Sequence, residues 1–278
     1  MLVSGQPGAA NHAKGRKTPG SNMITALASR SLRIAVLAFA PLTAAILATT
    51  AAAPQGAAPD YAAIIAAPDR SEADRNTDKR RDPVKLLSFT GVRNGMKVLD
   101  MGAGGGYSTE LMARAVGPSG KVYAQNASNL PERAKANFDA RLKTPAMANA
   151  TSLIRNFDDP VPPELRDLDL ITFFFYYHDT TYMEVDRAEM NRKLFAALKP
   201  GGHLVITDHS ARPGDGTSVG RSLHRIEESA LRREVEAAGF RLVAEGDFLR
   251  HPEDLRDFST TRPTGPVDEF VLKFEKPR

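Results

Sequence analysis

Apolar runs of strand length alternate with helical patterns along most of the chain after residue 84. The runs at 96–101, 121–125 and 203–208 are short and rich in aliphatic residues, and the run at 169–177, DLITFFFYY, is apolar almost throughout. A nearly continuous apolar run is typical of a strand that is buried on both faces of a parallel sheet. Further strands are expected near 152–156, 240–248 and 269–275.

Patterns with helical spacing separate these strands. They predict helices at about 108–116, 131–142, 183–198 and 227–238, and a short helix in the segment VKLLSFTGV that begins at residue 84. Strands that alternate with helices call for an α/β fold, a doubly wound, mostly parallel sheet with helices on both faces. The last two strands have no helical pattern between them, so we expect them to form an antiparallel hairpin at one edge of a seven-stranded sheet.

The N-terminal 53 residues have a different character. Arg30 and Arg33 precede an apolar core at about 34–50, and small residues follow it. This order is typical of a secretory signal peptide, so we expect export, to the periplasm in a bacterium, with no stable membrane span in the mature form. Residues 54–70 are expected to be a linker and 71–278 the folded domain, with the charged segment 71–82 as a solvated helix face.

Charge and cysteine content narrow the function classes. The formal net charge is +4, but residues 1–53 hold five basic residues and no acidic one, so the remainder carries −1. This near-neutral domain gives no indication of a nucleic-acid partner. The sequence contains no cysteine, so it has neither a disulfide framework nor thiolate chemistry.

The stretch VLDMGAGGGYSTELM, residues 98–112, places flexible backbone between a strand and a helix. Its pattern is acid-x-Gly-x-Gly-x-Gly, which lets the backbone approach a ligand closely. Tyr107 stands where a dinucleotide fingerprint needs a small residue, which disfavours a dehydrogenase. The acid, Asp100, suits a positively charged sulfonium better than a pyrophosphate.

This stretch resembles motif I of the class I S-adenosylmethionine-dependent methyltransferases. LKPGGHLVITDH, residues 198–209, resembles the turn and fifth strand of the same Rossmann-like fold. GPSGKVYAQN, YYHD and LHRIE are similar to a narrower family of predicted bacterial methyltransferases that often carry signal peptides. The resemblance implies S-adenosylmethionine as cofactor but no particular substrate. Methyl transfer to an oxygen or nitrogen of a small molecule is our leading interpretation.

The resemblance also assigns cofactor contacts. Asp100 is expected near the methionine end, and Asn126 stands where the family usually has an acid for the ribose hydroxyls. Asp158 is expected at the adenine amino group, with Asp159 an equal candidate. The cofactor-binding residues expected from the sequence are Asp100, Gly102, Gly104, Gly106, Asn126, Asp158 and Tyr176.

Two His–Asp pairs follow the fourth and fifth expected strands, where open α/β sheets hold their reacting groups. His178 is expected to be the general base, with Asp179 or Asp208 orienting it and His209 as second choice. A metal site built from these four residues has suitable ligand types, but the spacing does not demand one and none is expected.

Two alternatives stay open. The first is that the chain is a non-catalytic binder or sensor of an adenosyl ligand, since the glycine stretch would serve binding alone equally well. His224 and Arg225, after a flexible loop, either cover the pocket and contact an acidic substrate, or Arg225 is a surface residue at a helix start. YYHD stands where amino-directed nucleic-acid methyltransferases carry Asn/Asp-Pro-Pro-Tyr, which disfavours nucleic-acid substrates.

Overall fold

A computed structural model describes residues 56–278 of the chain. The expected signal peptide, with its core at about 34–50, lies outside the described residues. Within them, no helix is both long enough and apolar enough to cross a bilayer.

One seven-stranded sheet organises the described residues, in the order β3-β2-β1-β4-β5-β7-β6. Pairing is parallel from β3 to β5, whereas β7 is antiparallel to both β5 and β6. This confirms the doubly wound sheet and the terminal antiparallel hairpin. The strands are β1 Lys97–Met101, β2 Lys121–Asn126, β3 Ala150–Ile154, β4 Leu168–Phe174, β5 Leu198–His209, β6 Arg241–Gly246 and β7 Glu269–Glu275.

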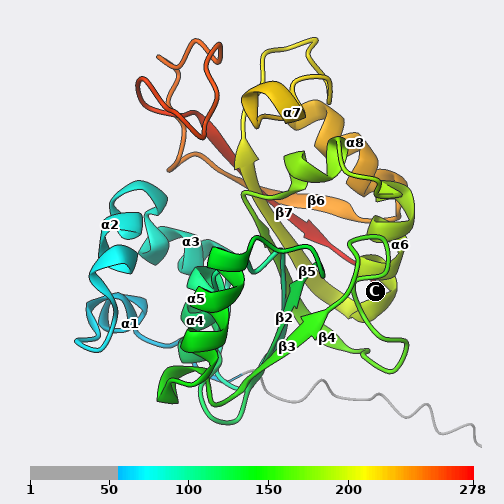
Figure 1. The fold of residues 1–278 in the computed structure, drawn as a ribbon. Coiled ribbons are helices and arrows are strands. Elements are labelled where there is room, and N and C mark those ends of the chain that lie inside the picture. The colour runs from blue at the N-terminus through cyan, green and yellow to red at the C-terminus, as the bar shows by residue number, and fades with distance from the viewer. Residues whose placement is uncertain (1–55) are drawn as a thin grey trace, which may run out of the picture. The chain divides into compact units, whose positions relative to one another are not determined.

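Helices pack on both faces of this sheet, as Figure 1 shows. Leu86 of α3 and Leu111 of α4 join Val98 and Val205 on one face, while the other face packs against α6 and α8. The α-helices are α1 Tyr61–Ala66, α2 Glu72–Arg81, α3 Pro83–Thr90, α4 Tyr107–Val116, α5 Glu132–Leu142, α6 Arg187–Ala197, α7 Gly220–Leu223 and α8 Glu228–Ala237. Two 3-10 helices, η1 Pro145–Met147 and η2 Tyr177–Thr181, complete the set.

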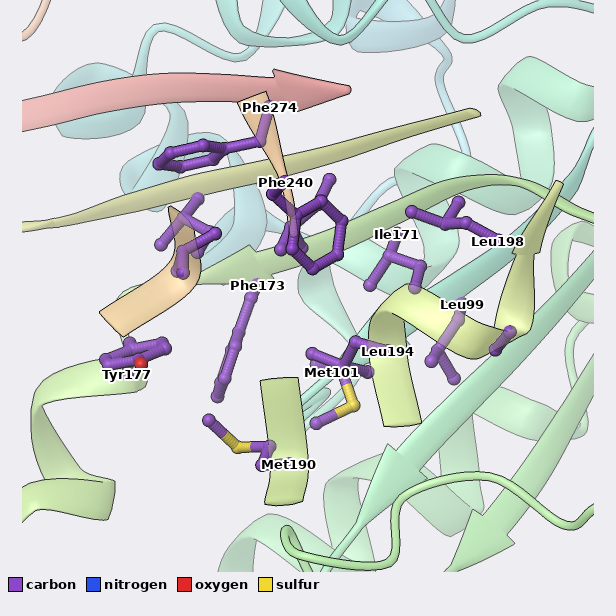
Figure 2. Close-up of a cluster of buried hydrophobic side chains, with 14 of the residues drawn as sticks. Leu99, Met101, Ile171, Phe173, Tyr177, Met190, Leu194, Leu198, Phe240 and Phe274 are labelled. Atoms are coloured by element: carbon purple, nitrogen blue, oxygen red, sulfur yellow. The ribbon is translucent and has the colours of Figure 1, made fainter. Parts of the chain in front are cut away.

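The larger apolar core lies between the sheet and the pair α6 and α8. Figure 2 shows Phe173 of β4 close to Met190 and Leu194 of α6. These side chains are fully buried. Alternate residues of the central strands enter the opposite core, which explains why β4 is apolar at nearly every position.

Two element ends differ from the sequence-based expectation, and local chemistry explains both. β4 ends at Phe174 because Phe175 adopts a left-handed backbone with φ of 58°. The predicted strand 169–177 is therefore too long. Helix α6 begins at Arg187 rather than at 183 because the Asp186 side chain accepts a hydrogen bond from the Glu189 amide and caps the helix there.

The segment before the sheet also differs from expectation. Within the expected linker, Tyr61 of α1 donates a hydrogen bond to the Val92 carbonyl at 2.7 Å, and Ile64 and Ile65 pack against the core. In α2, Asp74 is buried against Arg141 of α5. The described part of the expected linker, from residue 56, thus carries a helix that packs on the core, and α2 has one buried position, Asp74, on a helix that is otherwise largely solvated as expected.

Candidate functional site

The turn from β1 into α4 is built on a buried carboxylate. Asp100 is fully buried and accepts hydrogen bonds from the hydroxyls of Ser108 (2.8 Å), Thr109 (2.7 Å) and Thr172 (2.8 Å). Burial raises the pKa of Asp100, and the three hydroxyl donors oppose this rise. Asp100 thus joins the start of the glycine loop to the first turn of α4 and to β4. Its expected position at the methionine end of the cofactor stays a prediction.

Two side chains at the end of β2 accept hydrogen bonds from the backbone of the glycine loop. The Gly102 amide donates to Oε1 of Gln125 at 3.0 Å, and the Gly104 amide donates to Oδ1 of Asn126 at 2.8 Å. Nδ2 of Asn126 in turn donates to the Gly104 carbonyl at 3.3 Å. A carboxylate in place of Asn126 has no N–H for this second bond, which gives a physical reason for the amide. Binding of ribose by Asn126 stays a prediction.

The glycines of the loop have different surroundings. A Cβ on Gly102 would lie 3.0 Å from the Tyr176 ring, and one on Gly106 would lie 2.9 Å from Arg141. At Gly104, in contrast, a Cβ would meet only the Gly102 carbonyl, at 3.9 Å. Because all three have positive φ, the backbone requires glycine here, and Gly104 is the point at which the loop faces open space.

A cleft of about 380 Å³ lies beyond the ends of β2 and β3 and is lined by residues that directly follow these strands. Asp158 lines it together with Phe157, whose ring stacks on Tyr176 at 5.2 Å between centroids. Asp159 does not line it, since its carboxylate pairs with Arg155 and with Lys193, the latter at 2.7 Å. Of the two aspartates that the sequence left equal, only Asp158 faces the cleft.

The structure brings the two predicted His–Asp pairs together at the ends of β4 and β5. Nδ1 of His178 lies 2.6 Å from Oδ1 of Asp208, and its Nε2 lies 3.2 Å from Oδ1 of Asp179. Burial alone would lower the pKa of His178, but the two carboxylates outweigh it and raise the pKa to about 10. A ring that holds its proton at neutral pH is a donor, which counts against its expected role as general base.

His209, the second choice for a base, faces a different carboxylate. Its Nδ1 lies 3.0 Å from Oε1 of Glu269, which also accepts a hydrogen bond from Arg80 of α2 at 2.8 Å. Burial lowers the pKa of His209 to about 3 and, against the lowering effect of Arg80 and Arg81, raises the pKa of Glu269 to about 7. Glu269 is therefore a carboxyl that titrates near neutrality beside the strand ends.

Phe175, whose backbone is left-handed, has a ring that contacts side chains of both α2 and β5. The Arg81 guanidinium lies over the Phe175 ring at 4.4 Å and over the Tyr107 ring at 5.2 Å, and His209 lies 5.2 Å from Phe175 on the β5 side. A bulky residue at positive φ is strained, and such strain gathers at functional sites. Helix α2 thus places Arg80 and Arg81 at the ends of β4 and β5.

The segment after the flexible loop adds a third imidazole. His224 places Nδ1 3.1 Å from Oδ1 of Asp179. The next residue, Arg225, is fully buried, with a hydrogen bond to Asp254 at 2.7 Å and another to the Ser210 carbonyl. Arg225 is thus neither a surface residue nor a substrate contact, and it fixes the loop that carries His224.

Sequence reasoning missed Arg80, Glu269 and, as a partner of Asp179, His224. Arg80 lies in a run of mixed charge that resembles an ordinary solvated helix, and Glu269 begins an edge strand. The one available signal was the segment LHRIE, which contains His224.

Comparison with known proteins supports a common fold and chemistry. A family model described as a methyltransferase domain matches residues 74–245. The ubiquinone/menaquinone biosynthesis C-methyltransferase UbiE of Pseudomonas paraeruginosa is 32% identical over 126 residues, covering 45% of this chain and 46% of that protein. The enzyme of the same name from Cronobacter sakazakii is 26% identical over 170 residues, covering 60% of this chain and 64% of that protein.

The match to these curated relatives thus spans between about half and just under two thirds of their length. Among solved structures, a SAM-dependent methyltransferase from Aquifex aeolicus superimposes with a TM-score of 0.53 at 21% identity. The alignment covers 77% of this chain and 97% of that one. At that identity the likeness concerns the fold, which agrees with the strand order described above.

Proposed function

The chain belongs to the methyltransferase-domain family whose model matches residues 74–245, and from this premise we propose that it methylates a carbon atom of a small molecule. It is a class I methyltransferase that uses S-adenosylmethionine. An enzyme is therefore favoured over a non-catalytic adenosyl binder. The observation that supports a small acceptor most directly is the cluster of polar side chains where β4 and β5 end, beside the glycine loop.

The cofactor is proposed to lie along the glycine loop. The 380 Å³ cleft between Ala127 and Asp158 takes the adenosine, with the Asp158 carboxylate at the adenine amino group. Tyr176 links this cleft to Gly102, because its ring stacks on Phe157 and lies against that glycine. The methionine end and the activated methyl group then point toward the ends of β4 and β5.

The acceptor atom is the finer part of the proposal. An oxygen or nitrogen acceptor was expected from the sequence, and a hydroxyl acceptor needs a base to remove its proton. The two carboxylates around His178 count against that residue as the base. The curated relatives carry the name C-methyltransferase. We therefore place carbon first, with Glu269 as the carboxyl suited to accept a proton, and retain oxygen or nitrogen as the alternative.

Calorimetry on the full chain tests the cofactor placement. We expect saturable binding of S-adenosylmethionine and S-adenosylhomocysteine and none of NAD. Asp158→Ala should weaken binding, whereas Asp159→Ala, the matched control one residue away, should leave it unchanged because Asp159 pairs with Arg155 and Lys193 outside the cleft. Equal effects of the two variants would contradict the placement.

Methyl transfer from ¹³C-methyl-labelled cofactor tests the acceptor. A panel of enolic, phenolic and amine small molecules is incubated with the enzyme, and NMR of the product distinguishes C-methyl, O-methyl and N-methyl groups. Labelled O-methyl or N-methyl products alone would overturn the choice of carbon but leave the methyltransferase activity intact.

We also propose export, which rests on the sequence pattern of residues 30–53 alone: two arginines, an apolar core at about 34–50 and small residues after it. Fractionation of a Gram-negative host, with mass spectrometry of the N-terminus of the recovered protein, tests it. Full-length chain found only in the cytosolic fraction would contradict export.

A further inference from the structure

We propose that His178, Asp179 and His224 form a binding site for one divalent transition-metal ion at the ends of β4 and β5. The three side chains come from η2 and from the loop after α7, and their ligand atoms all lie within 4.8 Å of one another. This set of ligands differs from the one considered from the sequence, which had Asp208 and His209 in place of His224. Asp208 faces the far nitrogen of His178, and His209 faces Glu269.

The distances suit a coordination polyhedron. Oδ1 of Asp179 lies 3.2 Å from Nε2 of His178 and 3.1 Å from Nδ1 of His224. With metal–ligand bonds of about 2.1 Å, adjacent ligand atoms are about 3.0 Å apart in an octahedron and about 3.4 Å apart in a tetrahedron. The two observed edges fall between these values, so the Asp179 oxygen is spaced from both imidazoles as two adjacent ligands of one ion would be.

The surroundings orient the imidazole as metal sites usually do. Asp208, fully buried, holds Nδ1 of His178 at 2.6 Å and also accepts the His178 amide at 2.8 Å. A carboxylate on one ring nitrogen fixes the tautomer and directs the other nitrogen to the ion. The Tyr182 hydroxyl donates to Oδ1 of Asp179, the ligand oxygen itself, and so holds that carboxylate in position. These contacts make up an orienting shell around His178 and Asp179.

The donor set selects the class of ion. Two imidazoles and one carboxylate favour Zn²⁺, Fe²⁺ or Co²⁺ over Mg²⁺ and Ca²⁺, which prefer oxygen ligands. The side chains of Asp179 and His224 keep 18% and 27% of their surface exposed. Water therefore reaches the site, and coordination positions stay open for it or for an oxygen atom of a small molecule.

Cobalt titration of the full chain tests the site without reference to methyl transfer. The protein is stripped with a chelator and titrated with Co²⁺ in the absence of the cofactor, and the visible ligand-field absorption is followed. We expect saturation at one ion per chain and displacement by Zn²⁺, which binds such sites more tightly. Mg²⁺ should not compete.

Variants locate the ion. His224→Asn removes one ligand while tolerating the left-handed backbone at φ of 52°, and it should abolish saturable binding. Asp208→Asn should weaken binding about 10- to 100-fold because only the orienting shell changes. His203→Ala, in the middle of β5 and five residues before Asp208, is the control and should bind as the wild type does.

Circular dichroism confirms that each variant is folded. Absence of saturable Co²⁺ binding to the wild type, or equal binding by folded His224→Asn, would overturn the proposal. Either outcome leaves the binding of S-adenosylmethionine, measured separately, unaffected.

Discussion

The glycine loop and the strand-end cluster lie at the same edge of the sheet but are built by opposite means. The loop is held mostly by neutral side chains, since three hydroxyls donate to Asp100 and the amides of Gly102 and Gly104 donate to side-chain amide oxygens at the end of β2. The strand-end cluster is held by ionisable groups that share protons, among them His178 between Asp179 and Asp208. The loop therefore depends on one titratable carboxyl, the buried Asp100, whereas the strand-end cluster contains several groups whose charge changes with pH and with bound ions.

The largest effect is expected where the strand-end region depends on a buried ion pair. Arg225→Ala leaves the buried Asp254 carboxylate unpaired, and we expect it to lower the free energy of unfolding by about 3–5 kcal/mol, as measured by urea denaturation. Arg221→Ala, on the same segment but exposed, is the control and should change stability by less than about 0.5 kcal/mol. Similar losses in both variants would show that this region does not depend on the buried pair.

Asp100→Ala tests how far the stability of the glycine loop depends on one buried carboxylate. Three buried hydroxyls lose their acceptor, and we expect a loss of about 2–3 kcal/mol in the free energy of unfolding together with weaker binding of S-adenosylmethionine. Asp100→Asn keeps the shape and part of the hydrogen bonding, so its loss should be smaller. If Asp100→Asn costs as much as Asp100→Ala, the negative charge rather than the bonding pattern holds the loop.

Glu269 should make the stability of the strand-end cluster depend on pH. Because burial raises the pKa of Glu269 to about 7, its stabilising contribution is full below its unfolded pKa and is lost as pH rises through about 7. We expect wild-type stability to fall by about 3 kcal/mol relative to Glu269→Gln between pH 4.5 and pH 8, measured by urea denaturation across this range. Glu275→Gln, on the same strand, is the control. A constant difference between wild type and Glu269→Gln would refute the raised pKa.

The same contrast explains what the sequence could predict. The loop is contiguous, so its glycines, Asp100 and the ligand class could be inferred from one stretch of residues. The cluster joins Asp179 to His224 across 45 positions and Arg80 to Glu269 across 189. Such pairs depend on how helices dock on the sheet, which no local pattern encodes. The strand order was accessible because hydrophobic periodicity reports burial, whereas the end of β4 depended on the backbone of Phe175.

Asn126→Asp is expected to have the smallest effect, and it separates two roles for one residue. If Asn126 chiefly holds the loop, a carboxylate loses the bond to the Gly104 carbonyl and repels it, so the dissociation constant for S-adenosylmethionine should rise about tenfold, or about 1.4 kcal/mol. If it chiefly binds ribose, the acid that related enzymes carry there should tighten binding instead. Asn76→Asp, exposed on α2, adds the same charge away from the loop and the cleft and serves as the control. We expect the first outcome, because both polar atoms of Asn126 already bond to Gly104.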